Sequence, residues 1–460
     1  MSESTKKPGQ TQPRIIRHTF AREQIDADAA KVVHRLTRHG HETYLVGGCV
    51  RDLLAGMQPK DFDVATAATP GQVKKLFRNC WLIGRRFRLA HVVFGRERKV
   101  IEVSTFRARP VTLDDPRLGE QDLLIRDDNV FGEPWEDARR RDFTLNALFY
   151  DVGRRRIIDY VGGHRDLRDG LVRSIGEPGI RFREDPVRML RACKYAAKLS
   201  FRIEPKSEAA IAEYKDEIGR ASPSRLTEEL YKILGNGSAR PTLCHMLRHG
   251  LLAGLSPSMA RFLERPRQTW GWNGDRDGPA WDHLRALDAE VREGWVPSRA
   301  VQLAAVVVPM ARPHAERAAA GGAIHRREAT RNSVDLVLTA LALNFRIPKR
   351  DAERIRLIAT AQERMRDDRG GRRVSPGRIA GRDYFDDAVS FLRLECLATG
   401  QGWECYARWR AHAPDRLRRR LPAAPVALPP EITEPPRRKR RRRRPRRRKR
   451  GKRGASSPGS

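Results

Sequence analysis

LVGGCVRDLLAGMQPKDFDVAT, the stretch from Leu45 to Thr66, decides the fold. A strand-like segment leads into Gly47 and Gly48, and the helix-like VRDLLAG follows. Glycines between a strand and a helix let the backbone approach a phosphate closely, and a helix N-terminus favours anions. A Gly-Gly pair on its own is more often only a tight turn. Its meaning therefore depends on the residues that follow it.

Two aspartates, Asp61 and Asp63, come next, in the strand-like segment DFDVAT. Residues two apart on a strand point to the same face, so the two carboxylates would repel each other unless a cation lay between them. Magnesium, which prefers oxygen ligands, is the natural candidate. The alternative is a pair of surface aspartates at a strand edge. The glycine turn upstream favours the metal site, because metal-bridged triphosphate chemistry needs both a backbone cradle and a carboxylate-held metal pair.

The composition points to a polyanionic partner. The 460 residues contain 92 Lys and Arg against 57 Asp and Glu, a formal net charge of +35. Such a charge attracts nucleic acid first and an anionic membrane surface second. The six cysteines form no C-x-x-C pair, which argues against structural zinc and fits a reducing, cytoplasmic location. No apolar run approaches the length of a transmembrane helix, and the first residues have no apolar core typical of a signal peptide.

The order of short strands and helices predicts an α+β protein: a small mixed-sheet head followed by an all-α neck and body, with disordered termini. The predicted parts are a disordered N-terminus (1–22), a mixed-sheet head (23–160), a helical neck (161–235), a helical body (236–415) and a Pro-rich linker with an Arg-rich tail (416–460). Within the head we expect ETYLV, HVVF and KVIEVSTF to be strands. TPGQVKKLF should be a helix capped by Thr69, with Pro70 at its first position.

Four ordered motifs carry a family resemblance. The opening stretch resembles the head-domain motif of the polymerase β-type nucleotidyltransferases, and within them it is similar to the bacterial poly(A) polymerases and CCA-adding enzymes. EDARRRDFTLNALFYD (136–151), REDPVRMLRACKYAAKLSFRI (183–203) and SPSRLTEELYKIL (222–234) extend the resemblance over residues 40–255. It implies two-metal nucleotidyl transfer with Mg²⁺ and an NTP in a catalytic head (23–160). It also implies nucleobase recognition by a helix of the neck (161–235) and RNA binding by the body (236–415). The partner would be an RNA 3′ end, and no covalent nucleophile is needed.

The resemblance also implies a role for individual residues. The metal-binding carboxylates would be Asp61 and Asp63, and Asp142 would lie beside the nucleotide sugar. Asp52 matches the motif too, although its role could be structural. The nucleotide would be contacted by residues of all the motifs: Gly47, Gly48, Arg51, Arg140, Arg141, Asn146, Asp185 and Arg188.

Two of these assignments have a physical reading of their own. Asp185 and Arg188 lie near the start of a predicted helix, where Pro186 suits the first turn, and residues three apart are neighbours on one face. One offers acceptors and the other donors, a template for a nucleobase edge, and the alternative is an ordinary helical ion pair. Glu102 alternates with apolar neighbours on a predicted strand. It could add a third carboxylate to the metal site, or it could be a structural or positioning acid.

The choice between the two activities depends on other segments. GRRFRLAHVVFG (84–95) resembles the poly(A) polymerase form, whereas CCA-adding enzymes usually carry a shorter segment here. Its arginines, Arg85, Arg86 and Arg88, could instead form a solvated strand face. We therefore predict a polynucleotide adenylyltransferase that extends RNA with AMP from ATP, a reaction that promotes RNA decay. The alternatives are a CCA-adding tRNA nucleotidyltransferase and, in a different class, a non-catalytic RNA-binding protein with this fold.

The last part of the chain is strongly basic. Residues 437–453 contain 15 Lys or Arg and no acid, which fits an RNA-binding arm. A localisation signal or a membrane-surface patch is the alternative. The segment has no aromatic residue, so stacking on bases is not expected there.

Overall fold

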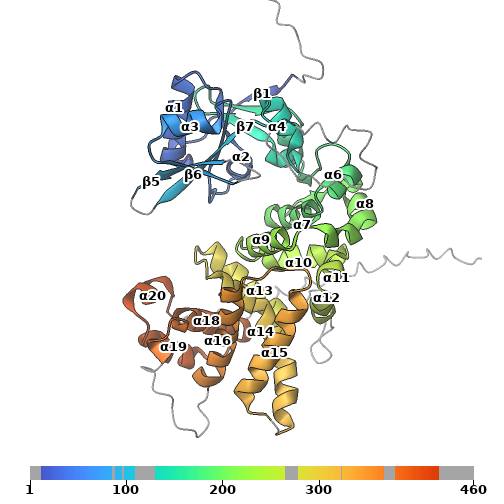
Figure 1. The fold of residues 1–460 in the computed structure, drawn as a ribbon, viewed down its shortest axis with the longest axis vertical. Helices are drawn as coiled ribbons and strands as arrows, with labels where there is room; N and C mark the ends of the chain where they lie inside the picture. Colours follow the sequence, from blue (N-terminus) through green and yellow to red (C-terminus); the bar gives the residue numbers. More distant parts are fainter. Residues whose placement is uncertain are drawn as a thin grey trace, which may run out of the picture. The chain divides into compact units, whose positions relative to one another are not determined.

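The strand before the glycine turn, β2 (Thr43–Val46), lies inside an eight-stranded mixed sheet (Figure 1). The strand order is β1-β8-β7-β2-β3-β6-β5-β4, in which β3 and β6 run parallel and the other neighbours antiparallel. The other strands are β1 (Arg14–Arg17), β3 (Asp63–Thr66), β4 (Cys80–Ile83), β5 (Leu89–Phe94), β6 (Lys99–Thr105), β7 (Leu148–Asp151) and β8 (Arg156–Asp159). This computed structural model describes residues 12–84, 89–95, 98–108, 130–264, 278–322, 324–366 and 379–423.

Helices cover the sheet because its strands alternate buried apolar residues on both faces. Leu45 and Val64 point to the face that packs against α1 (Ala27–Arg38) and α3 (Pro70–Leu76). Val46 and Phe149 point to the other face, where a second core cluster forms. The remaining helices of the head region are η1 (Arg22–Gln24), α2 (Gly48–Leu54), α4 (Pro134–Arg140), η3 (Thr144–Asn146) and α5 (Gly163–Arg168).

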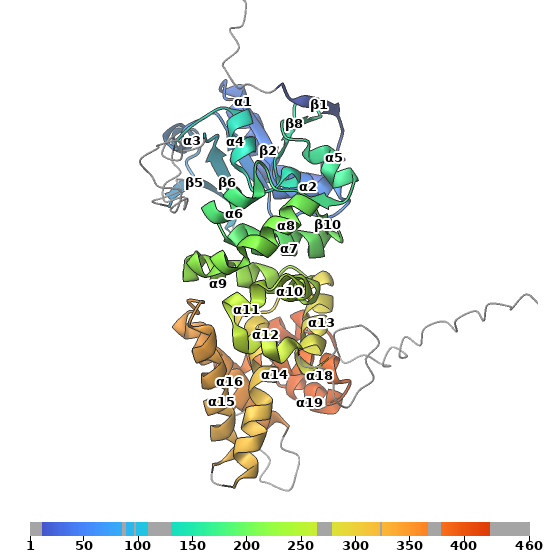
Figure 2. The same cartoon turned by 90° about the vertical axis from the view of Figure 1, so that its right-hand side faces the viewer.

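The rest of the described chain is almost wholly helical, and a small parallel pair, β9 (Leu171–Val172) and β10 (Arg202–Ile203), accompanies its first helices. The helices α14, α15, α16 and α18 pack against one another in Figure 2. The bounds are α6 (Pro178–Glu184), α7 (Val187–Leu199), α8 (Pro205–Tyr214), η4 (Lys215–Arg220), α9 (Pro223–Leu234), α10 (Ala239–Arg248), α11 (Leu251–Leu255), α12 (Pro257–Glu264), α13 (Pro279–Arg292), α14 (Arg299–Ala320), α15 (Arg326–Leu341), α16 (Lys349–Met365), α18 (Phe385–Thr399), α19 (Trp403–Ala411) and α20 (Asp415–Arg420).

The predicted fold class is confirmed, and so are the expected strands β2, β5 and β6. The helix α3 begins as expected, with Thr69 and Gln72 forming a reciprocal capping box and Pro70 in its first turn. The predicted limits near residues 160, 235 and 415 stay predictions, because contacts continue from the sheet through the helices to Pro422. Among the described residues no helix is both long and apolar enough to cross a membrane.

Two expectations about local structure are wrong. Part of the N-terminal segment expected to be disordered forms β1, which pairs with β8 from Arg14↔Asp159 to Arg17↔Arg156 and so satisfies its backbone at a sheet edge. The strand β3 starts at Asp63, so Asp61 precedes it, and the two aspartates are not strand neighbours on one face. Residues 1–11, 85–88 (with Arg85, Arg86 and Arg88), 109–129, 265–277 and the basic tail 437–453 lie outside the described residues.

Candidate active site

The glycine turn has the conformation that the sequence predicts. Gly47 follows β2 with a φ of 74° and precedes α2, whose first residue is Gly48. A Cβ atom on Gly47 would lie 3.0 Å from Nη1 of Arg141, and one on Gly48 would lie 3.6 Å from Nη2 of Arg51. Gly47 is therefore required both by its left-handed backbone and by the Arg141 side chain packed against it.

Arg141 is held firmly beside this turn. Its Nη2 and Nε atoms donate to Oδ2 of Asp137 at 2.8 and 3.1 Å, and its guanidinium lies over the Phe149 ring, 5.5 Å from the centroid. The Nη1 atom donates to the carbonyl oxygen of Asn146 at 3.4 Å. The family resemblance predicts that Arg141 contacts the nucleotide, and the structure brings it to the glycine turn 94 positions earlier in the chain.

Three carboxylates share the wall of one cavity of about 1840 Å³: Asp61, Asp63 and Glu102. The register pairs Asp63 directly with Glu102 on the neighbouring strand. The pKa of Asp63 is raised to about 6: burial is the largest cause, the negative charges of Glu102 and Asp61 add to it, and Arg141 opposes it. Asp61 and Asp63 therefore lie close enough to interact although only Asp63 belongs to β3.

These carboxylates do not form a complete magnesium site by themselves. Among the described residues, no three or more His, Cys, Asp or Glu side chains are grouped so that they could hold a metal ion. Glu102 thus adds no third ligand to Asp61 and Asp63 in this conformation, and its Oε1 lies 3.6 Å from Nε2 of His91. However, magnesium in phosphoryl-transfer sites is typically bound by one or two carboxylates plus substrate phosphates and water. A pair of mutually repelling carboxylates in an open cavity suits that arrangement.

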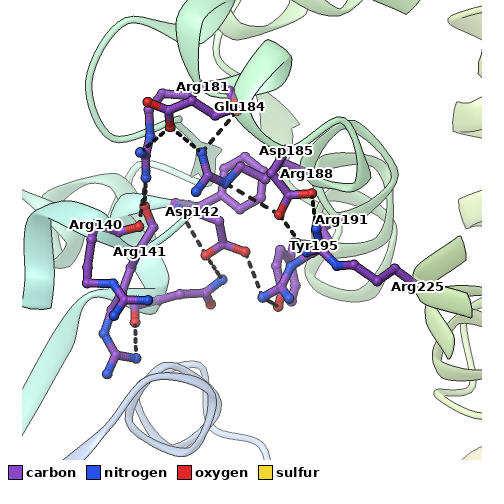
Figure 3. Close-up of polar contacts among 12 residues, drawn as sticks. Arg140, Arg141, Asp142, Arg181, Glu184, Asp185, Arg188, Arg191, Tyr195 and Arg225 are labelled. Carbon is purple, nitrogen blue, oxygen red and sulfur yellow. Dashed lines mark hydrogen bonds and ion pairs between the residues drawn. The ribbon is translucent and has the colours of Figure 1, made fainter. Parts of the chain in front are cut away.

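Asp142 is buried, with hydrogen bonds to one carboxylate oxygen and an ion pair at the other (Figure 3). Its Oδ1 accepts hydrogen bonds from Asn146 Nδ2 at 2.9 Å and from the backbone N–H of Phe143 at 2.8 Å. Its Oδ2 lies 2.7 Å from Nη2 of Arg191, which also donates to the Tyr195 hydroxyl at 3.0 Å. Burial by itself would raise the pKa of Asp142, but Arg191 and these hydrogen bonds outweigh it and lower the pKa to about 2.

The network continues from Asn146 into α2. Arg51 donates from Nη1 to Oδ1 of Asn146 at 2.6 Å and from Nε and Nη2 to Oδ1 of Asp52 at 2.8 and 2.6 Å. Asp52 Oδ2 then accepts from Nζ of Lys198 on α7 at 2.8 Å. The buried Arg51 and Asn146, predicted nucleotide contacts, are thus engaged inside the protein. Asp52 has a structural role here, because it ties α2 to α7.

Asp185 and Arg188 lie side by side, as predicted, but each has a stronger partner elsewhere. Arg188 Nε is 4.0 Å from Oδ2 of Asp185. Both Asp185 oxygens accept from Arg225 on α9, at 2.8 and 2.7 Å, in a two-pronged contact. Arg188 Nη1 donates to Glu184 Oε2 at 3.2 Å and to the carbonyl oxygen of Arg181 at 3.0 Å. Pro186, expected in the first turn, is the cap residue before α7.

Arg181 joins this group to the RRDFT segment. Its Nη1 donates to Glu184 at 2.6 Å, and its Nη2 donates to the carbonyl oxygens of Arg140 and Arg141 at 2.7 and 2.8 Å. Figure 3 shows these contacts as one continuous set running from Arg140 through Glu184 to α7. The backbone on either side of Asp142 is therefore positioned by the helices that follow it in sequence.

Several residues of this site were missed by sequence reasoning. They are Arg181, Glu184, Arg191, Tyr195 and Arg225. All five occur inside the motifs REDPVRMLRACKYAAKLSF and SPSRLTEELYKIL or just before them. The available signal was the density of charged residues on helices predicted to be amphipathic, since a charge on a packed face needs a partner.

Comparisons with known proteins point to the same family as the sequence motifs do. Three family models match the chain: the poly A polymerase head domain over residues 43–173, the probable RNA- and SrmB-binding site of polymerase A over 200–263, and the polymerase A arginine-rich C-terminus over 322–448. Poly(A) polymerase I of Salmonella typhi is 49% identical over 250 residues, which cover 54% of this chain and 53% of that protein. The CCA-adding enzyme of Bacillus velezensis is 34% identical over 245 residues, 53% of this chain and 59% of its own.

A solved structure shows the same fold over a longer span. The Bacillus stearothermophilus CCA-adding enzyme in complex with CTP superposes with a TM-score of 0.55 at 26% identity, covering 85% of this chain and 81% of its own. The chain belongs to the superfamily of the bacterial poly(A) polymerases and CCA-adding enzymes. Its sequence match spans about half the length of the curated poly(A) polymerases.

Proposed function

We propose that the chain is a polynucleotide adenylyltransferase that adds AMP from ATP to RNA 3′ ends. The observation that carries the proposal is the 49% identity to Poly(A) polymerase I over 250 residues, against 34% to the CCA-adding enzyme. The geometry supports it, because Gly47, Arg141 and the carboxylates of Asp61 and Asp63 converge where a triphosphate and two metal ions would have to meet.

Each group has a part in this proposal. Asp61 and Asp63 would hold magnesium, which when bound would lower the pKa of the RNA 3′-hydroxyl and offset phosphate charge. Arg141, fixed by Asp137, would present N–H groups toward the phosphates beside the Gly47 turn. Arg141 would not have to change its side-chain conformation during the reaction, since Asp137 and the carbonyl oxygen of Asn146 already hold it.

The base would be recognised between α7 and α9. Asp185 and Arg188 would offer an acceptor and a donor to the nucleobase edge, in an orientation imposed by Arg225 and Glu184. Asp142, whose oxygens are all engaged internally, would act by positioning Asn146 and the neighbouring backbone. The promotion of RNA decay by the added tails stays a prediction.

A CCA-adding enzyme is the second candidate, favoured by the likeness to the solved CCA-adding enzyme over most of the chain. The two are separated by incubating the purified protein with Mg²⁺ and one nucleoside triphosphate at a time. One set of reactions uses a single-stranded RNA, and the other a tRNA that lacks its terminal CCA. We expect long extension of the single-stranded RNA with ATP alone. Addition confined to tRNA and dependent on CTP would overturn the proposal in favour of the alternative.

The variant Asp61→Asn tests the metal assignment and the non-catalytic alternative together. It keeps the shape of the side chain and removes its charge. We expect RNA binding to remain and AMP addition to be lost. A fully active variant would show that Asp61 holds no essential metal, and a wild-type protein that binds RNA without adding AMP would favour the non-catalytic RNA-binding protein.

A further inference from the structure

A row of four side chains crosses one half of the sheet, starting at the carboxylates. The register places Asp63 of β3 opposite Glu102 of β6, Glu102 opposite His91 of β5, and His91 opposite Trp81 of β4. Directly opposed residues point to the same face of a sheet. The indole of Trp81 therefore stands on the face that carries Asp63, three strands away, or about 14 Å at the usual strand spacing.

This end of the row is an exposed apolar surface. Trp81 is 68% exposed, and two residues on the same face, Ile83 and Val100, are exposed as well. The alternate residues of the same strands, such as Cys80 and Val92, point to the buried core. Apolar side chains exposed singly are common, but an indole exposed to this degree and in line with the carboxylates marks a candidate interaction surface.

The position of the row relative to the proposed nucleotide cradle, the Gly47 turn with Asn146, suggests a role for Trp81. The glycine turn follows β2, and Asn146 lies two residues before the start of β7, so both are on one side of β3 in the strand order. The row extends from β3 to the opposite side, over β6, β5 and β4. The carboxylates thus separate a surface suited to a triphosphate from a surface that carries a free indole.

We propose that Trp81 is a stacking platform for the single-stranded 3′ segment of the RNA that the active site extends. The proposal rests on the adenylyltransferase function proposed above. With its 3′-hydroxyl at Asp61 and Asp63 and the ATP on the β2 side, the RNA has to leave on the other side, because attack and departure at phosphorus are roughly in line. A base about four stacked nucleotides from the end reaches Trp81, at about 3.4 Å per nucleotide.

RNA fits this surface better than a second copy of the chain does. Every nucleobase has a face that can stack on an indole, so a platform of this kind suits a strand without sequence preference. The cavity at the inner end of the row also contains Lys60 and Lys232, which can approach phosphates. Edge-to-edge pairing of two copies would use the backbone of β4, a strand of only four residues, and would not require the Trp81 side chain.

The test measures RNA binding and AMP addition separately. Binding of a labelled oligoadenylate of about eight nucleotides is followed by fluorescence anisotropy without ATP. The variants are Trp81→Ala, Trp81→Phe and, as the matched control, Leu82→Ala. Leu82 is its exposed neighbour, 41% exposed, and points to the opposite face. We expect the Kd for the RNA to be about tenfold higher for Trp81→Ala, close to the wild-type Kd for Trp81→Phe, and unchanged for Leu82→Ala.

Steady-state kinetics with primers of about two and about eight nucleotides add a second readout. Trp81→Ala should raise the KM for the longer primer. The KM for ATP, the KM for the shorter primer and kcat should stay unchanged. Equal binding by Trp81→Ala and the wild type, or an equal loss with both primers, would overturn the platform. A changed oligomeric state in light scattering with unchanged RNA affinity would overturn it too, in favour of a protein interface. Trp81-dependent binding by a wild-type protein that adds no AMP would support the platform and refute the adenylyltransferase.

Discussion

Gly47 is the residue at which backbone conformation and the site meet. Its φ of 74° lies in the left-handed region, and a Cβ atom would press on Arg141 at 3.0 Å. Gly56 has a similar φ of 71°, but a Cβ there would meet nothing within 4 Å. Substitutions at both glycines therefore distinguish the loss of stability caused by the backbone conformation from the displacement of Arg141.

We expect Gly47→Ala and Gly56→Ala each to lose at least about 1–2 kcal/mol of stability, because both force an L-residue to a positive φ. The loss should be larger for Gly47→Ala, since the ψ of −128° at Gly47 lies outside the left-handed helical region. Only Gly47→Ala should also lower kcat/KM for ATP, by at least tenfold, since Arg141 has to move. Urea unfolding and initial rates of AMP addition check the two parts. Equal activity of the two variants would show that Arg141 does not depend on Gly47.

Asp142 offers a prediction about pH. Its pKa is about 2 in the folded protein and about 4 in an unfolded chain, so its charge stabilises the fold above about pH 4, and this contribution is lost as pH falls toward 2. We expect Asp142→Asn to lower the free energy of unfolding by about 2 kcal/mol at pH 7 and to show a smaller loss of stability in acid. Denaturant titrations at several pH values measure both. Asp415→Asn, at a side chain that is 80% exposed, is the control and should change neither.

Some residues of the candidate site could be named from the sequence, whereas their partners could not. The paired acids Asp61 and Asp63 are visible in the residue types themselves, and Asp142 was named through the family resemblance. The contacts that orient the site join residues far apart, such as Asp52 with Lys198, 146 positions later, and Asp185 with Arg225, 40 positions later. Nothing local in the sequence indicates such pairs, because packing of whole helices creates them.

At the scale of elements, α9 holds the carboxylate of Asp185, the proposed base-reading group, through Arg225. A lysine cannot reproduce the two parallel hydrogen bonds that a guanidinium makes to a carboxylate. We expect Arg225→Lys to lower kcat/KM for ATP by about tenfold and to reduce the preference for ATP over the other nucleoside triphosphates, since Asp185 becomes free to turn. Rates with each triphosphate measure this. Arg220→Lys, in the exposed pair with Glu217 on η4, is the control. An unchanged preference for ATP in Arg225→Lys would mean that α9 does not orient the base-reading pair.

The helix α10 depends on a carboxylate from another helix. Asp288 on α13 accepts the backbone N–H groups of Ala239 and Arg240 at 2.6 and 2.8 Å, and burial raises its pKa to about 6 in spite of them. Because this value exceeds the unfolded one of about 4, the folded state binds the proton more tightly. Stability therefore falls as pH rises from about 4 to about 6.

We expect the free energy of unfolding of the wild type to fall by up to about 3 kcal/mol relative to Asp288→Asn across that pH range, since asparagine does not titrate there. Denaturant midpoints of both proteins between about pH 4 and pH 7 measure the difference. Curves that run parallel would show that Asp288 titrates at its ordinary pKa and that burial does not govern this cap.

Elements with a strong local signal were predicted well, and those that depend on distant partners were not. The cap residue Thr69 and the following Pro70 predict α3 from neighbouring residues alone. The short strand β1 has no such signal, because it is stabilised by β8, more than a hundred residues later. The start of β3 at Asp63 likewise reflects its pairing with Val46 and Glu102.

At the scale of the whole molecule, a small acidic centre sits within a chain of net charge +35. The 15 basic residues of 437–453 account for less than half of that charge, so 20 net positive charges remain on the rest. The proposed affinity for RNA should therefore come from two sources: the basic residues of 437–453 and the 20 net positive charges on the rest of the chain. The two sources should respond differently to salt and to mutation. In the proposed reaction the carboxylates of Asp61 and Asp63 take part in AMP addition and repel RNA, and the basic residues attract RNA.

Removal of the chain from Arg437 onward tests how these sources divide. Each phosphate neutralised on a single strand contributes about −0.7 to the slope of log K against log salt. We expect the truncated protein to bind RNA more weakly at low salt and to show a shallower slope, while AMP addition at saturating RNA stays near the wild-type rate, since the carboxylates and the base site are intact. Anisotropy at several salt concentrations and rates at saturating RNA measure the two quantities. An unchanged slope would assign the RNA affinity to the remaining 20 net charges, and a lost rate at saturating RNA would mean that the basic segment also takes part in the reaction.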